Sequence, residues 1–195
     1  MIPNLLVITD HTQCRLPLLD VVRQSIEAGA KGVLVRDKAL PQPERHELLK
    51  NVSAFTAGTA CQLLASSPSP FPVDGEHLAS NDEVPETRPP VLGRSCHSLD
   101  EIAAAEADGF DYVTLSPIFA TASKPGYGPI LGLNCLERAA EVTSLPILAL
   151  GGVEVNNARH CIDAGAQGAA VMGCVMRSAN PGKTISSLVV ELDLG

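Results

Sequence analysis

The segment "PILALGGVEVNNARHCIDAGAQGAAVMGCVM", residues 146–176, places a strand pattern, a helix pattern and a second strand pattern one after another. An apolar run at 146–152 ends in two glycines, and a helical pattern at 154–165 ends in a glycine. A second apolar run follows at 168–176. A strand, a helix and a strand joined by short turns are typical of a βαβ unit, in which the two strands lie parallel in one sheet.

The same alternation recurs along the 195 residues of the chain. Strand patterns lie at 5–10, 32–38, 60–66, 75–79, 90–97, 111–119, 146–152 and 168–176. Helix patterns lie at 18–29, 42–58, 98–109, 133–143, 154–165 and 181–192. This alternation predicts an α/β fold, a (β/α)8 TIM barrel, as a single domain over residues 1–195. An open, doubly wound sheet is the alternative, and it needs a reversal of strand order that the sequence does not reveal.

The connection between the third and fourth strand patterns lacks a helix signal. Pro68, Pro70 and Pro72 fall within residues 66–74. Proline has no backbone N–H to donate and its ring clashes with the preceding turn, so three prolines cannot sustain a helix. We therefore expect the helix after the third strand to be shortened or lost.

The charge and composition of the chain argue against several classes of binding partner and cellular location. The net charge of −8 argues against a nucleic-acid partner, although a local basic pocket can still bind an anionic small molecule. No apolar run approaches the roughly 18 residues of a membrane span, and no basic segment precedes the first apolar run as in a signal peptide. The six scattered cysteines favour reduced thiols in a cytoplasmic protein over a disulfide framework.

Functional groups of such barrels gather at the carboxyl ends of the strands, around one mouth. Basic and hydroxyl residues lie at or just after the ends of several strand patterns, namely Arg36, Lys38, Arg94, Ser95, Thr121, Ser123 and Lys124. The last two strands end instead in Gly151, Gly152 and Gly173, whose backbone N–H groups can bind an anion. The sequence therefore predicts a mouth that binds phosphate.

These features also have plain structural interpretations. The glycine pair after the seventh strand is equally compatible with a simple turn, and Arg36 and Lys38 are compatible with solvated loop charges. His77 is more typical of a hydrogen-bonded packing residue than of a ligand or a base. A single carboxylate such as Asp82 binds Mg²⁺ weakly unless substrate phosphates complete its coordination.

Several segments, in the correct order, resemble the family of thiamine-phosphate synthase and its sister, the TenI-like thiazole tautomerase. They are "LLVITD" (5–10), "VRDK" (35–38), "DGEHLASND" (74–82), "LGRSCHSLDE" (92–101), "DYVTLSPIFATASK" (111–124), "LALGGV" (148–153) and "GAQGAAVMGCV" (165–175). The resemblance covers nearly the whole chain, and it implies the same (β/α)8 barrel.

The resemblance also implies a reaction and a site. The synthase is a transferase of thiamine biosynthesis that joins hydroxymethylpyrimidine diphosphate to thiazole phosphate and releases pyrophosphate. By position, the residues implied to hold the diphosphate are Arg36, Lys38, Ser95 and Lys124. Those implied to contact the thiazole phosphate are Thr121, Ser123, Gly151, Gly152 and Gly173. Mg²⁺ is the implied cofactor with Asp82 as a ligand, small phosphorylated thiamine precursors are the implied partners, and a homo-oligomer is an open expectation.

Three positions depart from the synthase pattern. The family's Asn-Asp pair after the third strand reads Ala65-Ser66, so one metal carboxylate and one pyrimidine contact are missing. The family pattern has a glutamine two residues before Arg36, and this chain has Leu34 there. The pattern also has a serine in the last strand, where this chain has Gly173. These departures mainly affect the part of the implied site that would bind the pyrimidine and the metal ion.

The tautomerase pattern also fits incompletely. Its acid–base histidine falls at Pro117, and proline cannot transfer a proton, so His97 or His77 would have to take that role. Three hypotheses follow: a synthase with a divergent metal site, a tautomerase-like isomerase, and a non-catalytic binder of thiamine precursors. We choose the synthase as the first hypothesis, because Asp82 and Lys124 match its pattern.

Overall fold

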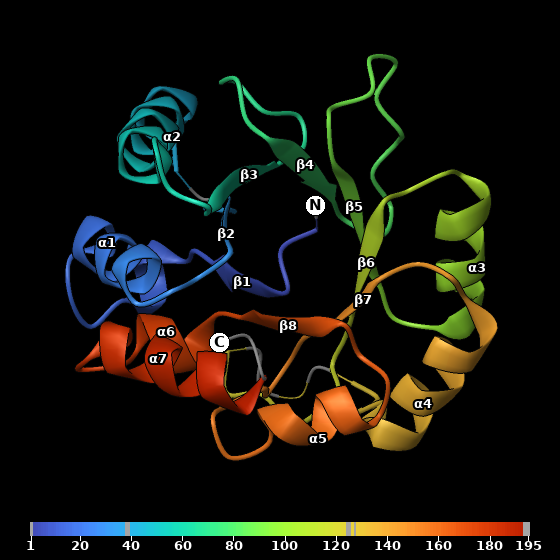
Figure 1. Ribbon diagram of the computed structural model, residues 1–195. Coiled ribbons are helices and arrows are strands. Elements are labelled where there is room, and N and C mark those ends of the chain that lie inside the picture. Colours follow the sequence, from blue (N-terminus) through green and yellow to red (C-terminus); the bar gives the residue numbers. More distant parts are fainter. Residues whose placement is uncertain (1, 38–39, 124–125, 127, 193–195) are drawn as a thin grey trace.

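The computed structural model describes residues 2–37, 40–123, 126 and 128–192. Within them, parallel strands pair in sequence order into a closed barrel, and β8 pairs with β1 to complete the ring (Figure 1). The strands are β1 (Leu5–Ile8), β2 (Gly32–Val35), β3 (Gln62–Ser66), β4 (Gly75–Leu78), β5 (Leu92–Cys96), β6 (Tyr112–Leu115), β7 (Ile147–Ala149) and β8 (Gly168–Val171). The predicted (β/α)8 barrel is confirmed, and the open sheet is not the fold of this chain.

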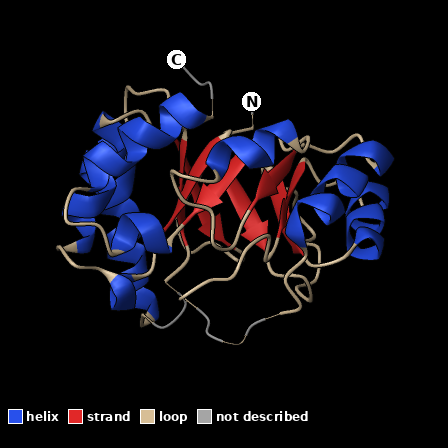
Figure 2. Ribbon diagram, turned by 90° about the horizontal axis from the view of Figure 1, so that it is seen from below, coloured by secondary structure: helices blue, strands red, loops and turns tan. Residues whose placement is uncertain are grey.

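Helices form an outer layer around the strands, as Figure 2 shows. They are α1 (Leu18–Glu27), α2 (Gln42–Thr56), α3 (Leu99–Ala107), α4 (Gly132–Val142), α5 (Ala158–Asp163), α6 (Gly173–Met176) and α7 (Pro181–Glu191), with a short 3-10 helix, η1 (His11–Gln13). The Ser98 side chain caps the start of α3, because it accepts a hydrogen bond from the Glu101 amide. The end of the last strand pattern is wrong, because residues 173–176 form α6.

Two neighbouring connections of the barrel carry no helix, although the structure describes every residue from 67 to 91. The β3–β4 connection is a loop over 67–74, as its prolines predict. The β4–β5 connection, 79–91, is also a loop, and no helix pattern lies there in the sequence (Figure 1). Pro85, Pro89 and Pro90 supply the same physical reason there, since each removes a helical hydrogen-bond donor.

Two arginine side chains donate to backbone carbonyls near these loops. Arg45 on α2 donates a hydrogen bond to the backbone carbonyl of Ser66, where β3 ends. Arg94 on β5 donates to the backbone carbonyl of Asp82, in the β4–β5 loop. The first contact connects α2 to the end of β3, and the second connects the β4–β5 loop to the barrel.

Arg94 itself lies on the outside of the barrel. Its guanidinium is 4.4 Å from the centre of the Phe110 ring and forms an ion pair with Asp108 at 3.6 Å. The prediction that Arg94 faces the mouth is therefore wrong. Successive residues of a strand point to opposite faces, and in β5 Gly93 and Ser95 take the two inward positions.

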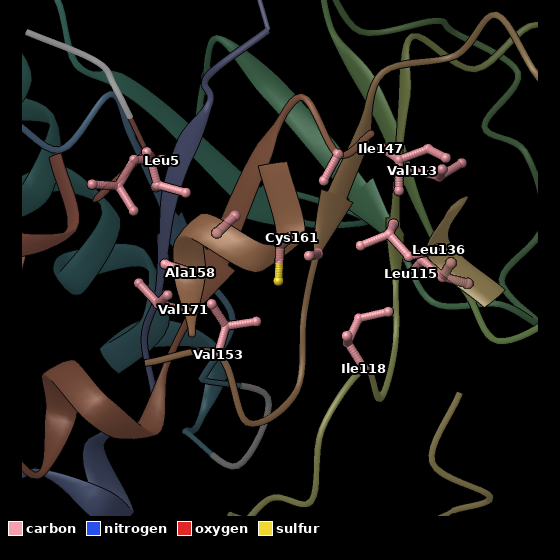
Figure 3. Close-up of a cluster of buried hydrophobic side chains, with 14 of the residues drawn as sticks. Leu5, Val113, Leu115, Ile118, Leu136, Ile147, Val153, Ala158, Cys161 and Val171 are labelled. Atoms are coloured by element: carbon pink, nitrogen blue, oxygen red, sulfur yellow. The ribbon is translucent and has the colours of Figure 1, made fainter. Parts of the chain in front are cut away.

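Side chains fill the barrel, so its centre is core and not a channel. The inward-facing cluster consists of Leu6, Ile8, Leu34, Leu64, Tyr112, Leu148 and Ala170. A larger cluster lies between strands and helices, where Figure 3 shows Ala158 and Cys161 of α5 beside Ile147 and Val171 of the neighbouring strands. A filled interior leaves the ends of the strands as the place where a ligand can bind.

All six cysteines are free thiols. In the described residues, no helix combines the length and the apolarity needed to cross a bilayer.

Candidate active site

A cavity of about 380 Å³ opens at the carboxyl ends of the strands. Loops that follow β1, β2, β5, β6, β7 and β8 all contribute to its wall. The sequence-predicted site residues that line it are Arg36, Ser95, Thr121, Ser123, Gly151, Gly152 and Gly173. Residues more than a hundred positions apart in the sequence therefore meet around one space.

Three other predicted residues are not placed in this wall. Lys38 and Lys124 lie outside the described residues. Asp82 does not line the cavity, and its carboxylate accepts the backbone N–H of Ala79 at 2.8 Å, which stabilises the turn after β4. The functional roles of these three residues stay predictions.

The described side chains do not build a metal site by themselves. No three His, Cys, Asp or Glu residues come close enough to share an ion in the part of the chain that the structure covers. Ser66 stands where the family pattern has a carboxylate, and Asp82 is already engaged with Ala79. We therefore assign no step of the chemistry to a metal.

The glycine pair after β7 is required by the packing of the mouth. Gly151 and Gly152 have φ values of 89° and 66°, in the left-handed region that other residues rarely adopt. A Cβ on Gly151 would lie 2.7 Å from Pro117 Cα, and one on Gly152 would lie 2.8 Å from Phe119 Cβ. These glycines thus let the β7 loop approach the β6 loop closely, and the same bare backbone faces the cavity.

Arg36 is anchored at the end of β2. Its backbone N–H donates to Thr9 Oγ1 at 3.1 Å, and the next residue, Asp37, has a fully buried carboxylate that contacts Thr9 and His11. The Arg36 side chain reaches the cavity wall beside Asp10. Burial alone would raise the pKa of Asp10, but hydrogen bonds from Thr12 and Gln13, with the Arg36 charge, hold the pKa below its ordinary value.

Gln13 and Arg177 are polar residues of the wall that the sequence analysis did not identify. Arg177 follows Gly173 by four positions, so the spacing of one helical turn is the signal that could have found it. Gln13 lies in η1, directly after the first strand end. Their side chains contact each other, and both contact Ser123.

A buried hydrogen-bonded chain leads from the barrel core to the cavity. The Tyr112 hydroxyl is 2.9 Å from His77 Nδ1, and His77 Nε2 is 3.0 Å from Ser95 Oγ. Gly93 makes room for the tyrosine, because a Cβ there would lie 2.6 Å from the Tyr112 hydroxyl oxygen. Burial raises the pKa of Tyr112 well above its ordinary value, so this hydroxyl stays protonated. The interpretation of His77 as a hydrogen-bonded packing residue fits these contacts, and it also positions Ser95.

The Tyr112→Phe variant is expected to lower the free energy of unfolding by about 1–3 kcal/mol, because His77 Nδ1 loses a buried hydroxyl partner. Urea unfolding of the two proteins measures the difference. Adding His77→Leu to the variant is expected to restore part of the loss, since both polar groups are then gone. A loss below about 0.5 kcal/mol in the single variant would show that the hydroxyl contact contributes little.

His97 also lines the cavity, next to the position of the tautomerase's histidine. Its Nδ1 is 2.8 Å from the backbone carbonyl of Ser116, the residue that precedes Pro117. The sulfur of Cys174 lies in the same wall, but burial raises the pKa of that thiol to about 12, so it is not a thiolate at neutral pH. The cavity thus offers cations, hydroxyls, bare backbone and imidazole to a ligand.

Comparison with known proteins shows which family this chain matches. The sequence model of a family described as thiamine monophosphate synthase matches residues 5–175. A thiamine-phosphate synthase of Methanoculleus marisnigri is 35% identical over 184 residues, which cover 89% of this chain and 87% of the relative. Another, from Vibrio parahaemolyticus, is 31% identical over 200 residues, covering 97% and 98% of the two chains.

The fold agrees with these sequence matches. A solved structure of thiamine phosphate pyrophosphorylase from Pyrococcus furiosus superimposes with a TM-score of 0.86 at 26% identity, covering 98% of this chain and 96% of that one. Each segment that carries the resemblance in the sequence contributes residues to the cavity wall. The family model matches most of the chain, and its relatives and its barrel agree with that match. The chain therefore belongs to the thiamine monophosphate synthase family.

Proposed function

We propose that the protein joins hydroxymethylpyrimidine diphosphate to thiazole phosphate and releases pyrophosphate. The observation that carries this proposal is that two sets of residues with chemistry suited to anions line one cavity. One set is Arg36, which directly follows β2, and Ser95, which lies in β5. The β6, β7 and β8 loops supply the other set, Thr121, Ser123, Gly151, Gly152 and Gly173. Two phosphorylated substrates need two such sets.

The reaction requires stabilisation of a leaving group more than it requires a nucleophile from the protein. The bond between the pyrimidine methylene carbon and the diphosphate oxygen breaks, and its electron pair leaves with pyrophosphate. The thiazole nitrogen then donates its lone pair to the methylene carbon and forms the new bond. In this proposal Arg36, which lines the cavity, stabilises the negative charge that develops on the diphosphate, and Ser95, which contacts His77, serves as a hydroxyl donor.

The remaining features of the proposal, apart from the location, rest on the resemblance alone. Lys38 and Lys124 are proposed as further cations for the diphosphate. Asp82 is proposed to assist Mg²⁺, which a diphosphate substrate binds through its own oxygens. A homo-oligomeric assembly is proposed on the same ground, and a cytoplasmic location is proposed from the scattered, unpaired cysteines.

The direct test is an assay for pyrophosphate release. The protein is incubated with both substrates and Mg²⁺, and each substrate alone serves as the control. We expect release that needs both substrates and rises with Mg²⁺ concentration. No release above the single-substrate controls would contradict the proposal.

A second candidate is a tautomerase-like isomerase of thiazole phosphate. The observation that favours it is the contact of His97 with Ser116, which puts an imidazole beside the position where the sister family has its histidine. NMR of the thiazole phosphate in D₂O, without any pyrimidine substrate, tests this candidate through isomerisation or enzyme-dependent deuterium exchange. Tight binding with neither reaction would instead identify a non-catalytic binder.

A further inference from the structure

The guanidinium of Arg177 lies in the part of the cavity where the β1, β6 and β8 loops meet. Its Nη1 donates to Gln13 Oε1 and lies 3.1 Å from Ser123 Oγ. Ser123 Oγ donates to the same Gln13 oxygen at 2.9 Å. One neutral amide oxygen therefore accepts both hydrogen bonds and holds the arginine in place.

The absence of a side chain at Gly173 makes room for this guanidinium. A Cβ on Gly173 would lie 2.6 Å from Arg177 Nη1 and 2.6 Å from Ser123 Oγ. Ordinary van der Waals contact needs about 3.5–4 Å, so a side chain at position 173 would have to displace the arginine. The arginine thus packs directly on the backbone at the start of α6, in the region predicted to bind phosphate.

The positive charge of Arg177 is not neutralised by a carboxylate of the described chain. Glu154 lines the same cavity, yet no described Asp or Glu forms an ion pair with Arg177. Its partners among the described residues are the Gln13 amide and the Ser123 hydroxyl, both uncharged. A guanidinium has five N–H donors in a planar fork that matches the oxygens of a phosphate.

We propose that Arg177 is a phosphate ligand of this cavity and selects the phosphorylated thiazole over the unphosphorylated one. The phosphate oxygens replace Gln13 and Ser123 as partners of the guanidinium, which gains a charged acceptor in exchange for two neutral ones. This inference rests on the proposed function, because that function supplies a phosphate monoester as the substrate. It adds a specificity-determining residue that neither the strand ends nor the family pattern indicated.

Calorimetric titration of two ligands tests the selection. Thiazole phosphate and the corresponding thiazole alcohol are each titrated into the wild type and the Arg177→Ala variant. We expect the variant to bind the phosphate about tenfold to a hundredfold more weakly, because a charged hydrogen bond is lost. Its affinity for the alcohol is expected to stay within about twofold, since an alcohol offers the guanidinium no negative charge.

A matched control removes the same charge elsewhere. Arg23 lies on α1, where it pairs with Asp20 and Glu27 away from the cavity. Arg23→Ala is expected to leave both affinities unchanged, which separates a local contact from the general field of the protein. Thermal unfolding of each variant confirms that the affinities refer to folded protein.

Gly173→Ala tests the same contact from the opposite side. The added Cβ is expected to displace the guanidinium and weaken phosphate binding even though Arg177 is present. Gly173 is itself proposed to contact the phosphate, so the informative comparison is the loss that Gly173→Ala causes with and without Arg177. A smaller loss in the Arg177→Ala background is expected, and the same loss in both backgrounds would contradict the proposed contact.

The outcomes separate this inference from the proposed function. An undiminished preference for the phosphate in Arg177→Ala would overturn the role of Arg177 and leave the proposed reaction intact. A wild type without any preference for the phosphate would overturn both. A clear loss of preference in the variant, in a protein that releases no pyrophosphate, would support the arginine's role and reject the reaction.

Discussion

Replacing Arg36 with alanine is expected to lower kcat/KM for pyrophosphate release by about a hundredfold to a thousandfold. Arg36 lines the cavity. In the proposed reaction it faces the diphosphate as negative charge accumulates on the leaving oxygens. Removing one such preorganised donor typically costs this much in rate, because a water molecule cannot replace its fixed charge. The measurement is the initial rate of pyrophosphate release at varied concentrations of both substrates.

The backbone of Arg36 provides a reason to expect a folded variant. The contact that anchors this position is the backbone N–H to Thr9 Oγ1, which alanine retains. Arg23→Ala is the matched control for loss of one positive charge, and its rate is expected to stay near that of the wild type. A rate within about threefold of the wild type in Arg36→Ala would remove Arg36 from the proposed catalytic groups.

Gly152→Ala is expected to lower the free energy of unfolding by about 2–5 kcal/mol. A non-glycine residue at φ 66° costs about 1–2 kcal/mol. The added Cβ would also collide with Phe119 Cβ at 2.8 Å and with the carbonyl oxygen of Ala120, and overpacking of this kind costs about 1–3 kcal/mol more. Thermal unfolding measures the loss, which corresponds to a decrease in Tm of roughly 4–20 °C.

Gly58 provides a control with the same backbone conformation and no collision. Its φ is 74°, and nothing lies within 4 Å of the position of an added Cβ. Gly58→Ala is therefore expected to cost only the conformational part, about 1–2 kcal/mol. Equal losses in the two variants would mean that the β6 loop moves aside freely, and the close approach at Gly152 would then be unimportant for stability.

The barrel could be predicted from the sequence because each βα unit carries its own local signals. Strand patterns followed by helix patterns appear in order, and parallel strands joined in this way pair with their neighbours. The helix boundaries were less well predicted. Residues 154–157 precede α5 in the structure, and 173–176 belong to α6 and not to a strand. A short apolar segment after a strand is compatible with either structure, and tertiary packing decides between them.

Part of the candidate site was also accessible from the sequence. Arg36, Ser95, Thr121 and Ser123 lie at or just after the ends of predicted strands, and the barrel rule alone brings strand ends to one mouth. The same rule failed for Arg94, since it counts residues near a strand end without regard to the face on which they lie. A shift of one position along a strand moves a side chain from the cavity to the outer surface.

The sequence by itself determined the order of the barrel units, the loss of a helix at the prolines and the family of the chain. Only the tertiary structure decided which polar groups meet. Gln13, Ser123 and Arg177 come from loops that are 110 and 54 residues apart along the chain, and they join at one amide oxygen. Tyr112 reaches His77 because Gly93 leaves the space for its ring. Contacts of this kind depend on side-chain direction and on the room left by a glycine in another element, and neither is encoded in the local pattern of either segment.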